Sequence, residues 1–185
     1  MRIIAGQYKG RRLFSPNDNN IRPTTDRVKE TIFNILFSKN RLNGTVLDLF
    51  CGSGALGLEA LSRGATHCSF VDKEKQSIVL TQKNIDKIGI QNCSVMQNDA
   101  HFMLKHFAKM GTKFDLILLD PPYNGAYEAR LLDAIFENQI LNHQGLVVLE
   151  TSTDTKLSTT NPIYQMIDTR KLGATTISFF EYNAN

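Results

Sequence analysis

The sequence predicts a Rossmann-like α/β fold, with a mostly parallel seven-stranded sheet that ends in an antiparallel hairpin. Short apolar runs alternate with amphipathic stretches from residue 46 onward, which is typical of a parallel sheet covered by helices on both faces. A glycine-rich turn follows the first apolar run, and the last two runs are rich in β-branched and aromatic residues. Together these observations predict a parallel sheet that is closed by a C-terminal hairpin.

Each element of the core follows from its residue pattern. Five parallel strands are expected where the apolar runs are short and bounded by polar or turn residues, at 46–50, 69–72, 94–97, 116–120 and 146–150. Amphipathic stretches between them predict helices at 55–63, 75–88, 102–109 and 129–140. The last two strands are expected at 163–171 and 175–182, joined by the turn Leu172-Gly173-Ala174.

The segment before the core has a different character. Residues 2–14 alternate weakly around Gly6 and Gly10, which predicts a small β-hairpin. Arg22-Pro23 ends the loop that follows, and a helix is expected to begin near Thr25. This helix has apolar residues at helical spacing, namely Val28, Ile32, Ile35 and Leu36. The chain is expected to be one domain, 1–185, with 1–44 as a basic extension and 45–185 as the catalytic core.

Length and composition indicate a cytoplasmic globular protein, expected to be a monomer. With 185 residues, 42% of them hydrophobic, the chain can bury a substantial core without disulfides. No apolar run approaches the roughly 20 residues of a membrane span, and the N-terminus lacks the apolar core of a signal peptide. Cys51, Cys68 and Cys93 are expected to be reduced thiols, and no spacing of Cys or His indicates a metal site.

Positive charge is concentrated at one end of the chain. Residues 1–47 carry nine Lys or Arg against three Asp or Glu, whereas the remaining residues carry twelve against fifteen. Such an excess can bind the phosphates of a nucleic acid, although a solvated basic face explains the charge alone equally well. The candidates for nucleic-acid contact are Arg2, Lys9, Arg11, Arg12, Arg22 and Arg27.

The turn after the first strand is a candidate cofactor loop. It runs from Gly52 through Gly54 to Gly57 in a GxGxxG pattern, where glycines permit a sharp turn and a close approach to a ligand. Asp72 ends the second strand, where its carboxylate can accept hydrogen bonds from both hydroxyls of a ribose. Dinucleotides and S-adenosylmethionine both carry this ribose, so the pattern does not choose between them.

Two further acidic positions favour S-adenosylmethionine. Asp48 precedes the glycines, where it can hold the methionyl amino group through the loop or a water, whereas it would repel a pyrophosphate. Asp99 follows the third strand and can accept from the adenine amino group while the Ala100 amide meets a ring nitrogen, although Asp99 can also cap the next helix. The predicted cofactor residues are Asp48, Phe50, Cys51, Gly52, Ser53, Gly54, Asp72, Lys73, Asp99 and Ala100.

Asp120-Pro121-Pro122-Tyr123 ends the fourth strand and is the candidate catalytic motif. An amino nitrogen on a base is a poor nucleophile because its lone pair is delocalised into the ring. The Asp120 carboxylate and the Pro121 carbonyl are two acceptors that can favour a pyramidal nitrogen facing the methyl donor. Pro121 and Pro122 fix the backbone, and Tyr123 offers a ring on which an extruded base can stack. The alternative is a strand-ending turn in which Tyr123 only packs on the surface.

The motifs resemble those of the bacterial 16S ribosomal RNA (guanine-N2)-methyltransferases over nearly the whole chain. The matching stretches are residues 2–6 with Gly10-Arg11, residues 22–30, residues 48–64 and residues 120–123. The resemblance implies a class I methyltransferase fold and transfer of a methyl group to N2 of guanine 966 in 16S rRNA of an assembled or nearly assembled small subunit. It assigns cofactor contacts to the glycine loop, Asp72, Asp99 and Ala100, and catalysis to Asp120, Pro121, Pro122 and Tyr123. Cys51 and Asn124-Gly125 depart from the family pattern.

The residues by themselves leave other functions open. A DNA adenine-N6 or cytosine-N4 methyltransferase would use the same catalytic motif, but so short a chain has no room for a sizeable target-recognition domain. An NAD-dependent oxidoreductase is disfavoured by Asp48 and by the absence of an obvious proton donor after the fourth strand. A non-enzymatic RNA-binding module is disfavoured by the intact glycines and the Asp-Pro-Pro-Tyr motif.

Overall fold

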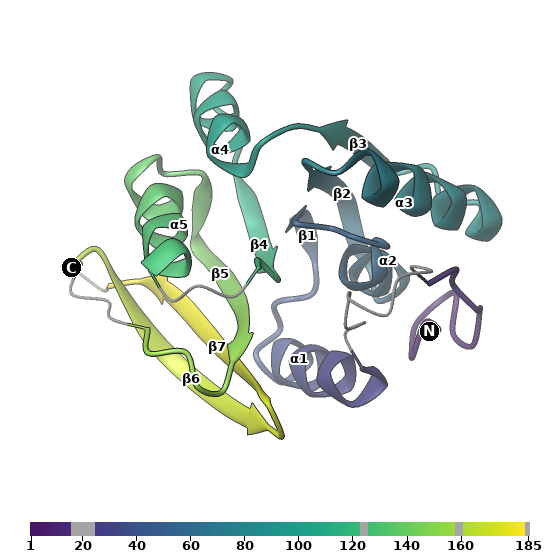
Figure 1. Ribbon diagram of the computed structural model, residues 1–185, viewed down its shortest axis with the longest axis horizontal. Coiled ribbons are helices and arrows are strands. Elements are labelled where there is room, and N and C mark those ends of the chain that lie inside the picture. The colour runs from purple at the N-terminus through teal and green to yellow at the C-terminus, as the bar shows by residue number, and fades with distance from the viewer. Residues whose placement is uncertain (16–24, 123–125, 158–160, 184–185) are drawn as a thin grey trace.

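The sheet is at the centre of the computed structural model, which describes residues 1–15, 25–122, 126–157 and 161–183. Its strand order is β3-β2-β1-β4-β5-β7-β6 (Figure 1). Strands β1 to β5 run parallel, and β7 lies antiparallel between β5 and β6, which confirms the predicted sheet. The strands are β1 (Gly44–Leu49), β2 (Ala65–Asp72), β3 (Cys93–Gln97), β4 (Phe114–Leu119), β5 (Leu141–Ser152), β6 (Tyr164–Leu172) and β7 (Thr175–Tyr182).

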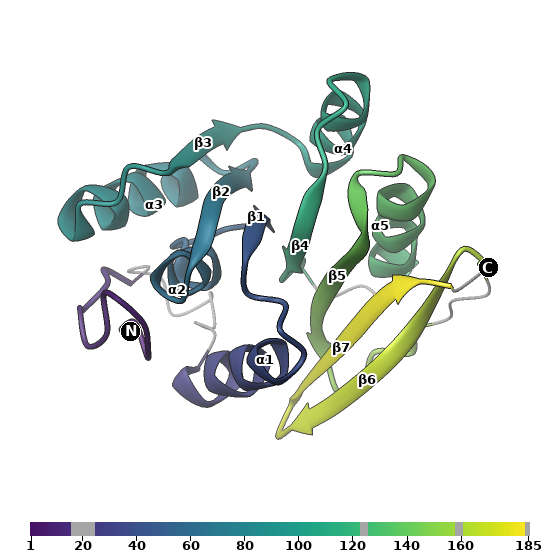
Figure 2. The same ribbon diagram turned by 180° about the vertical axis from the view of Figure 1, so that it is seen from behind.

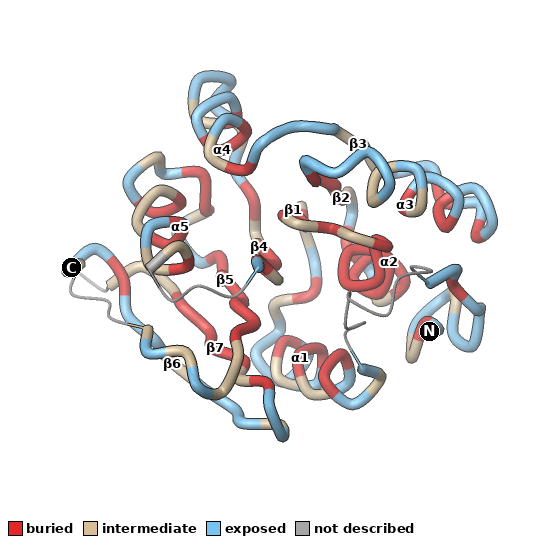
Figure 3. Tube along the Cα trace, in the orientation of Figure 1, coloured by how far each residue is buried: buried red, intermediate tan, exposed pale blue. Residues whose placement is uncertain are grey.

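Helices cover both faces of this sheet. The helices are α1 (Asp26–Ser38), α2 (Ala55–Ser62), α3 (Lys75–Ile88), α4 (Ala100–Lys109) and α5 (Ala126–Glu137). Helices α1, α2 and α3 share one hydrophobic cluster, and α4 and α5 share another on the opposite face (Figures 1 and 2). Buried residues follow the strands and the sheet-facing sides of the helices (Figure 3). No helix in the described parts of the chain is both long and apolar enough to cross a membrane.

The ends of several elements differ from the prediction. Strand β2 begins at Ala65 and β5 at Leu141, before the apolar runs that mark their centres, because both ends still pair with a neighbouring strand. Backbone hydrogen bonding does not require an apolar side chain, so pairing extends into polar sequence. Helix α5 begins at Ala126 and ends at Glu137, before Gln139 adopts a left-handed backbone with φ 53°.

The N-terminal segment, residues 1–15, folds back on itself as the small hairpin that the sequence predicts, with the amide of Ile3 donating to the carbonyl of Arg11 and the amide of Leu13 to that of Met1, both at 3.0 Å. A single bridge pairs Arg2 with Arg12. The amides of Ile4 and Ala5 donate to the carboxylate of Glu59 at 2.7 and 3.0 Å instead of to an opposing strand. Attachment to α2 therefore takes the place of cross-strand pairing at Ile4 and Ala5, which keeps the hairpin short.

Candidate active site

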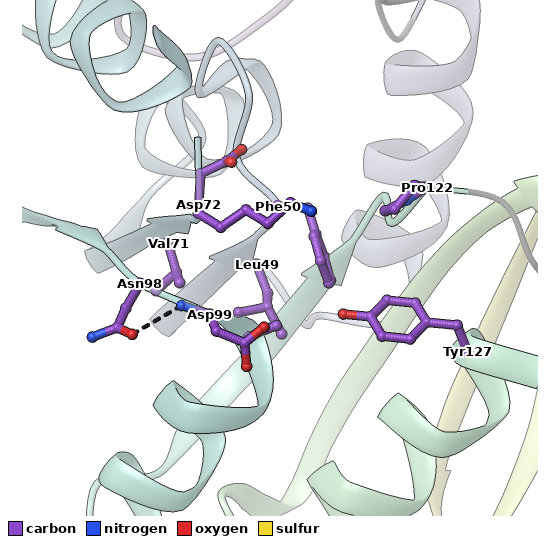
Figure 4. A pocket seen from close by; sticks show the side chains of 10 residues that line it. Leu49, Phe50, Val71, Asp72, Asn98, Asp99, Pro122 and Tyr127 are labelled. Carbon is purple, nitrogen blue, oxygen red and sulfur yellow. Dashed lines mark hydrogen bonds between the residues drawn. The ribbon is translucent and has the colours of Figure 1, made fainter. Parts of the chain in front are cut away.

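A cavity of about 430 Å³ opens at the carboxyl ends of β1 and β2, beside the start of α4 (Figure 4). In an open parallel sheet, ligands bind at this end, near the point where the strand order reverses, which here lies between β1 and β4. Five predicted cofactor residues line the cavity, namely Phe50, Asp72, Lys73, Asp99 and Ala100. The predicted catalytic residue Pro122 also lines it, together with Leu49, Val71, Asn98 and Tyr127. The structure thus brings together residues that are far apart in sequence.

The glycine loop forms the turn between β1 and α2, next to the cavity. Gly52 and Gly54 have positive φ angles of 54° and 76°, which only glycine adopts at little cost. A Cβ at Gly57 would lie 2.3 Å from the ring of Phe70, so this glycine lets α2 pack closely on β2. These glycines therefore shape the loop, although the predicted cofactor residues Asp48, Cys51, Gly52, Ser53 and Gly54 are not among those that line the cavity.

Phe50 holds a strained backbone conformation at the edge of the cavity. Its φ of 74° lies in the left-handed region, which costs a non-glycine residue energy and is concentrated at functional sites. Its amide and that of Cys51 both donate to the carbonyl of Val71, at 2.9 and 3.0 Å. This pair of bonds fixes the turn and aims the Phe50 ring into the cavity (Figure 4).

Asp72 connects the glycine loop to the end of β2. One carboxylate oxygen accepts from the amide of Gly52 at 2.9 Å, and the other accepts from the amide of Glu74 at 2.9 Å. A carboxylate has about four lone-pair sites, so each oxygen can accept a second hydrogen bond from a ligand. Asp72 is therefore held in a fixed orientation where it lines the cavity.

Asp48 is buried beneath the loop, where one oxygen accepts from the amide of Gly57 at 2.8 Å. Burial raises the pKa of Asp48 to about 7, and the negative charges of Asp120 and Asp72 contribute to the increase. Three carboxylates thus influence one another at this end of the sheet. Because like charges repel, the cluster favours a positively charged ligand.

Asp99 caps helix α4 and also lines the cavity. Its Oδ1 accepts from the amide of Phe102 at 3.1 Å, so the capping role expected as an alternative is present. The cap fixes the carboxylate beside Ala100, which is the first residue of the helix and also lines the cavity. Capping and ligand contact do not compete, because the carboxylate has a second oxygen.

The predicted catalytic motif follows β4, directly beside β1. Asp120 is partly buried, Pro121 is buried, and Pro122 is exposed at the cavity. Asp120 follows Leu119, which pairs with Leu49 of β1 just before the glycine loop, so the motif begins beside that loop. Tyr123 lies outside the described residues, so its proposed stacking role stays a prediction.

Tyr127 is a cavity residue that sequence reasoning missed. It lies in the first turn of α5, and its ring meets Phe50 edge-on with a centroid distance of 6.1 Å (Figure 4). On another side it meets the ring of His101 at 5.6 Å. An aromatic residue four positions after the Asp-Pro-Pro-Tyr tyrosine was the available signal, but only the fold shows that it faces the loop after β1.

Two polar residues of α3, also missed by sequence reasoning, support the glycine loop from outside the cavity. Thr81 donates to the carbonyl of Gly52 at 3.0 Å, and Asn84 donates to the carbonyl of Ser53 at 2.9 Å. Asn84 also accepts from the amide of Phe14 at 2.7 Å and donates to its carbonyl at 3.1 Å. Asn84 therefore joins the N-terminal segment to the loop.

The basic residues of the N-terminal region differ in their surroundings. Arg2 forms an ion pair with Asp26 at 3.0 Å, and Arg11 donates to the carbonyl of Ile88 at 2.7 Å. Both guanidinium groups therefore have protein partners. Arg22 lies outside the described residues, and the remaining candidates are exposed, namely Lys9, Arg12 and Arg27.

Known proteins match this protein in sequence over almost the whole chain. A family model described as "Conserved hypothetical protein 95" matches residues 1–181. "Putative rRNA methyltransferase YlbH" of Bacillus subtilis (strain 168) is 41% identical over 92% of each chain. "Ribosomal RNA small subunit methyltransferase D" of Escherichia coli (strain K12) is 34% identical over 86% of this chain and 78% of that protein.

A solved structure has the same fold over its full length. The structure titled "Putative methyltransferase yhhF from Escherichia coli" aligns with a TM-score of 0.86 and 31% identity, covering 100% of this chain and 99% of that one. The strand order, the glycine loop and the carboxyl-end cavity are thus the features of a class I methyltransferase fold. The chain belongs to the Conserved hypothetical protein 95 family.

Proposed function

We propose that this protein is an S-adenosylmethionine-dependent methyltransferase that acts on ribosomal RNA. The observation that carries the proposal is one cavity that is bordered by Asp72 and Asp99 on one side and by Pro122 of the Asp-Pro-Pro turn on the other. Cofactor-binding candidates and catalytic candidates therefore meet in the same space. The names of the two relatives above support both the reaction and the class of substrate.

The cavity suits the proposed cofactor in size and in charge. Its volume of about 430 Å³ lies in the usual range for small-molecule sites. Asp72 accepts from the ribose hydroxyls, while Asp99 and the Ala100 amide meet the adenine edge. The carboxylates of Asp48, Asp72 and Asp120 favour the positive charges of the cofactor and would repel the pyrophosphate of a dinucleotide. When bound, S-adenosylmethionine supplies the methyl group as an electrophile.

Asp120 and Pro121 prepare the acceptor nitrogen. The carboxylate and the fixed carbonyl accept from its two N–H groups, which directs the lone pair toward the methyl group. Transfer to this nitrogen would release the cofactor sulfur as a neutral thioether, and Asp120 would take up the proton that the nitrogen loses. Tyr123 remains our candidate for the surface that holds the base.

The finer proposal is that the acceptor is N2 of a guanine in 16S rRNA, expected to be guanine 966. The base is not chosen by the chemistry of the site, because guanine, adenine and cytosine all carry an exocyclic amine. The likeness of the N-terminal stretches to the guanine-N2 family and the small-subunit relative support this substrate. Exposed Lys9, Arg12 and Arg27 are the proposed phosphate contacts.

Transfer of radiolabelled methyl groups tests the proposal. Purified protein is incubated with labelled S-adenosylmethionine and with 30S particles lacking the modification, naked 16S rRNA or duplex DNA, and the labelled nucleosides are then separated. We expect label in N2-methylguanosine of the small-subunit RNA. Label in DNA alone, or in no substrate, would overturn the proposed function, whereas label on another rRNA base would overturn only the guanine assignment.

The raised pKa of Asp48 predicts a pH dependence of cofactor binding. Because its pKa is about 7 without ligand, the carboxyl group is mostly neutral at pH 6 and mostly charged at pH 8. A positively charged ligand favours the charged form, so binding lowers this pKa and releases a proton. We expect the Kd for S-adenosylmethionine, measured by calorimetry, to be about tenfold weaker at pH 6 than at pH 8.

Asp48→Asn provides the control for this titration. The asparagine cannot ionise but retains a carbonyl oxygen for the amide of Gly57. Its Kd should be weaker than that of the unsubstituted protein at pH 8 and should change little between pH 6 and pH 8. An equally steep pH dependence in this variant would assign the titration to another group.

A further inference from the structure

The exposed face of helix α4 carries a second group of basic and aromatic side chains. We name this group, consisting of Phe102, Lys105, His106, Lys109 and Met110, the α4 outer face. All five residues are exposed, and the apolar side chains of Phe102 and Met110 are 56% and 65% accessible. The opposite side of the helix is buried against the sheet and α5, through Met103, Leu104 and Phe107. The outer face therefore has a composition that packing inside the chain does not explain.

The charge of this region has one sign. Residues 100–114 contain Lys105, Lys109 and Lys113 but no Asp or Glu. None of these lysines lies within 4.0 Å of a carboxylate oxygen in the described parts of the chain. A row of cations without carboxylate partners attracts a polyanion.

Aromatic rings lie on the outer face and, in a separate group, beside the cavity. Phe102 and His106 stack with a centroid distance of 6.4 Å and an interplanar angle of 7°. On the cavity side, His101 meets Tyr127, and Tyr127 meets Phe50. Lysines interleaved with exposed rings are the usual combination for binding single-stranded nucleic acid, because cations contact phosphates and rings stack on bases.

The α4 outer face and the N-terminal segment flank the cavity from opposite faces of the sheet. Helix α4 packs in the hydrophobic cluster on one face, whereas Ile3 and Leu13 of the N-terminal segment pack in the cluster on the other. Ala100, at the start of α4, lines the cavity, and the sulfur of Met1 lies 3.6 Å from Oγ of Ser53 in the adjoining glycine loop. Because α4 runs from the carboxyl edge of the sheet toward the amino edge, where β4 begins, an RNA strand that leaves the cavity along α4 would meet Phe102 first and then Lys105 and Lys109.

We propose that the α4 outer face binds the RNA strand next to the target base, on the side of the cavity opposite the N-terminal segment. This inference rests on the proposed function, and it adds a binding surface that lies outside the basic N-terminal end. The one-sign charge favours RNA as the occupant over a protein surface, because Lys105 and Lys109 would need matched carboxylates on a protein but meet phosphate at every nucleotide.

Binding measurements on Lys105→Ala/Lys109→Ala test the charge component. With naked 16S rRNA near physiological salt, we expect about tenfold weaker binding and a salt dependence that is flatter by about one to two units of log Kd per log salt. The Kd for S-adenosylmethionine should not change. The control Lys156→Ala/Lys171→Ala removes the same charge from exposed positions near the C-terminal strands and should have little effect.

The outcomes separate this inference from the proposed function. Normal binding by Lys105→Ala/Lys109→Ala, or an equal loss in the control, would overturn the α4 surface while leaving methyl transfer by the unsubstituted protein intact. If the unsubstituted protein neither binds nor methylates rRNA, both proposals fail together.

The aromatic component is tested at Phe102, which is exposed and therefore contributes little to the folding of the core. Phe102→Ala should weaken RNA binding at least about fivefold without changing the salt dependence, because stacking involves no counterion release. Phe102→p-benzoylphenylalanine, irradiated on 30S particles, should form cross-links to RNA. Cross-links to a ribosomal protein alone would identify a protein as the occupant and overturn the proposal.

Discussion

Replacement of Asp120 by alanine is expected to lower the rate of methyl transfer by at least about 100- to 1000-fold, the usual cost of removing a preorganised polar group from a reaction centre. The Kd for S-adenosylmethionine should stay within a few-fold, because Asp120 is assigned mainly to the acceptor amine. Single-turnover transfer at saturating rRNA, together with calorimetric cofactor binding, measures the two effects separately. The combination of lost transfer and retained binding would distinguish a catalytic group from a cofactor ligand.

Two variants make this result interpretable. Asp120→Asn keeps an acceptor oxygen but loses the charge and the ability to take up a proton, so it should retain more activity than Asp120→Ala and less than the unsubstituted protein. Asp154→Ala removes an exposed carboxylate far along the chain and should transfer methyl groups normally. Full activity in Asp120→Ala would refute the proposed mechanism.

The architecture could be predicted from sequence because its signals are local. The expected runs overlap all seven strands, and the bounds of α3 and β7 agree with those expected. The N-terminal hairpin was predicted, but its attachment to the core was not, because the acceptor is Glu59, which lies 55 residues from Ile4. A pattern read along a short window contains no information about such a contact.

The residues of the candidate site also fall into those that the sequence predicts and those that only the fold shows. Asp72 and Asp99 were predicted from their position at the ends of strands, and the structure places both at the cavity. Tyr127 and Asn84 were missed because their importance depends on contacts between separate elements, with Phe50 in one case and with Phe14 and Ser53 in the other. Asp48 was expected near the cofactor, but its burial and its bond to Gly57 follow only from the packing of α2.

Net charge counted along the sequence does not show where the charged side chains lie in the folded protein. Residues after 47 carry a small excess of acidic groups, which directed attention to the N-terminal end. In three dimensions, part of that acidic excess lines the cavity as Asp72 and Asp99. Helix α4, by contrast, presents only basic and neutral side chains. Opposite charges are thus separated over a short distance, which suits a site that takes a cationic cofactor and a polyanionic substrate.

Glu59 is the main attachment point of the N-terminal segment to the core. Its side chain is fully buried and accepts from the amides of Ile4 and Ala5 and from Nε of Arg63 at 2.7 Å. Burial lowers the pKa of Lys29, and the charge of Glu59 opposes this decrease. Removal of Glu59 would therefore leave the Arg63 guanidinium and two amides without their acceptor, and it would remove a negative charge that acts on buried Lys29.

Glu59→Ala should lower the free energy of unfolding by about 3 to 5 kcal/mol, because breaking a buried ion pair on one side leaves the other charge uncompensated. For a chain of this size that corresponds to a fall of roughly 10 °C in the melting temperature. Glu30→Ala, which removes an exposed carboxylate from α1, should change stability by less than about 0.5 kcal/mol. Denaturant unfolding of both variants measures the difference. Equal stabilities would mean that the N-terminal segment is held chiefly by Ser62 and Asn84, and rRNA binding would then survive the loss of Glu59.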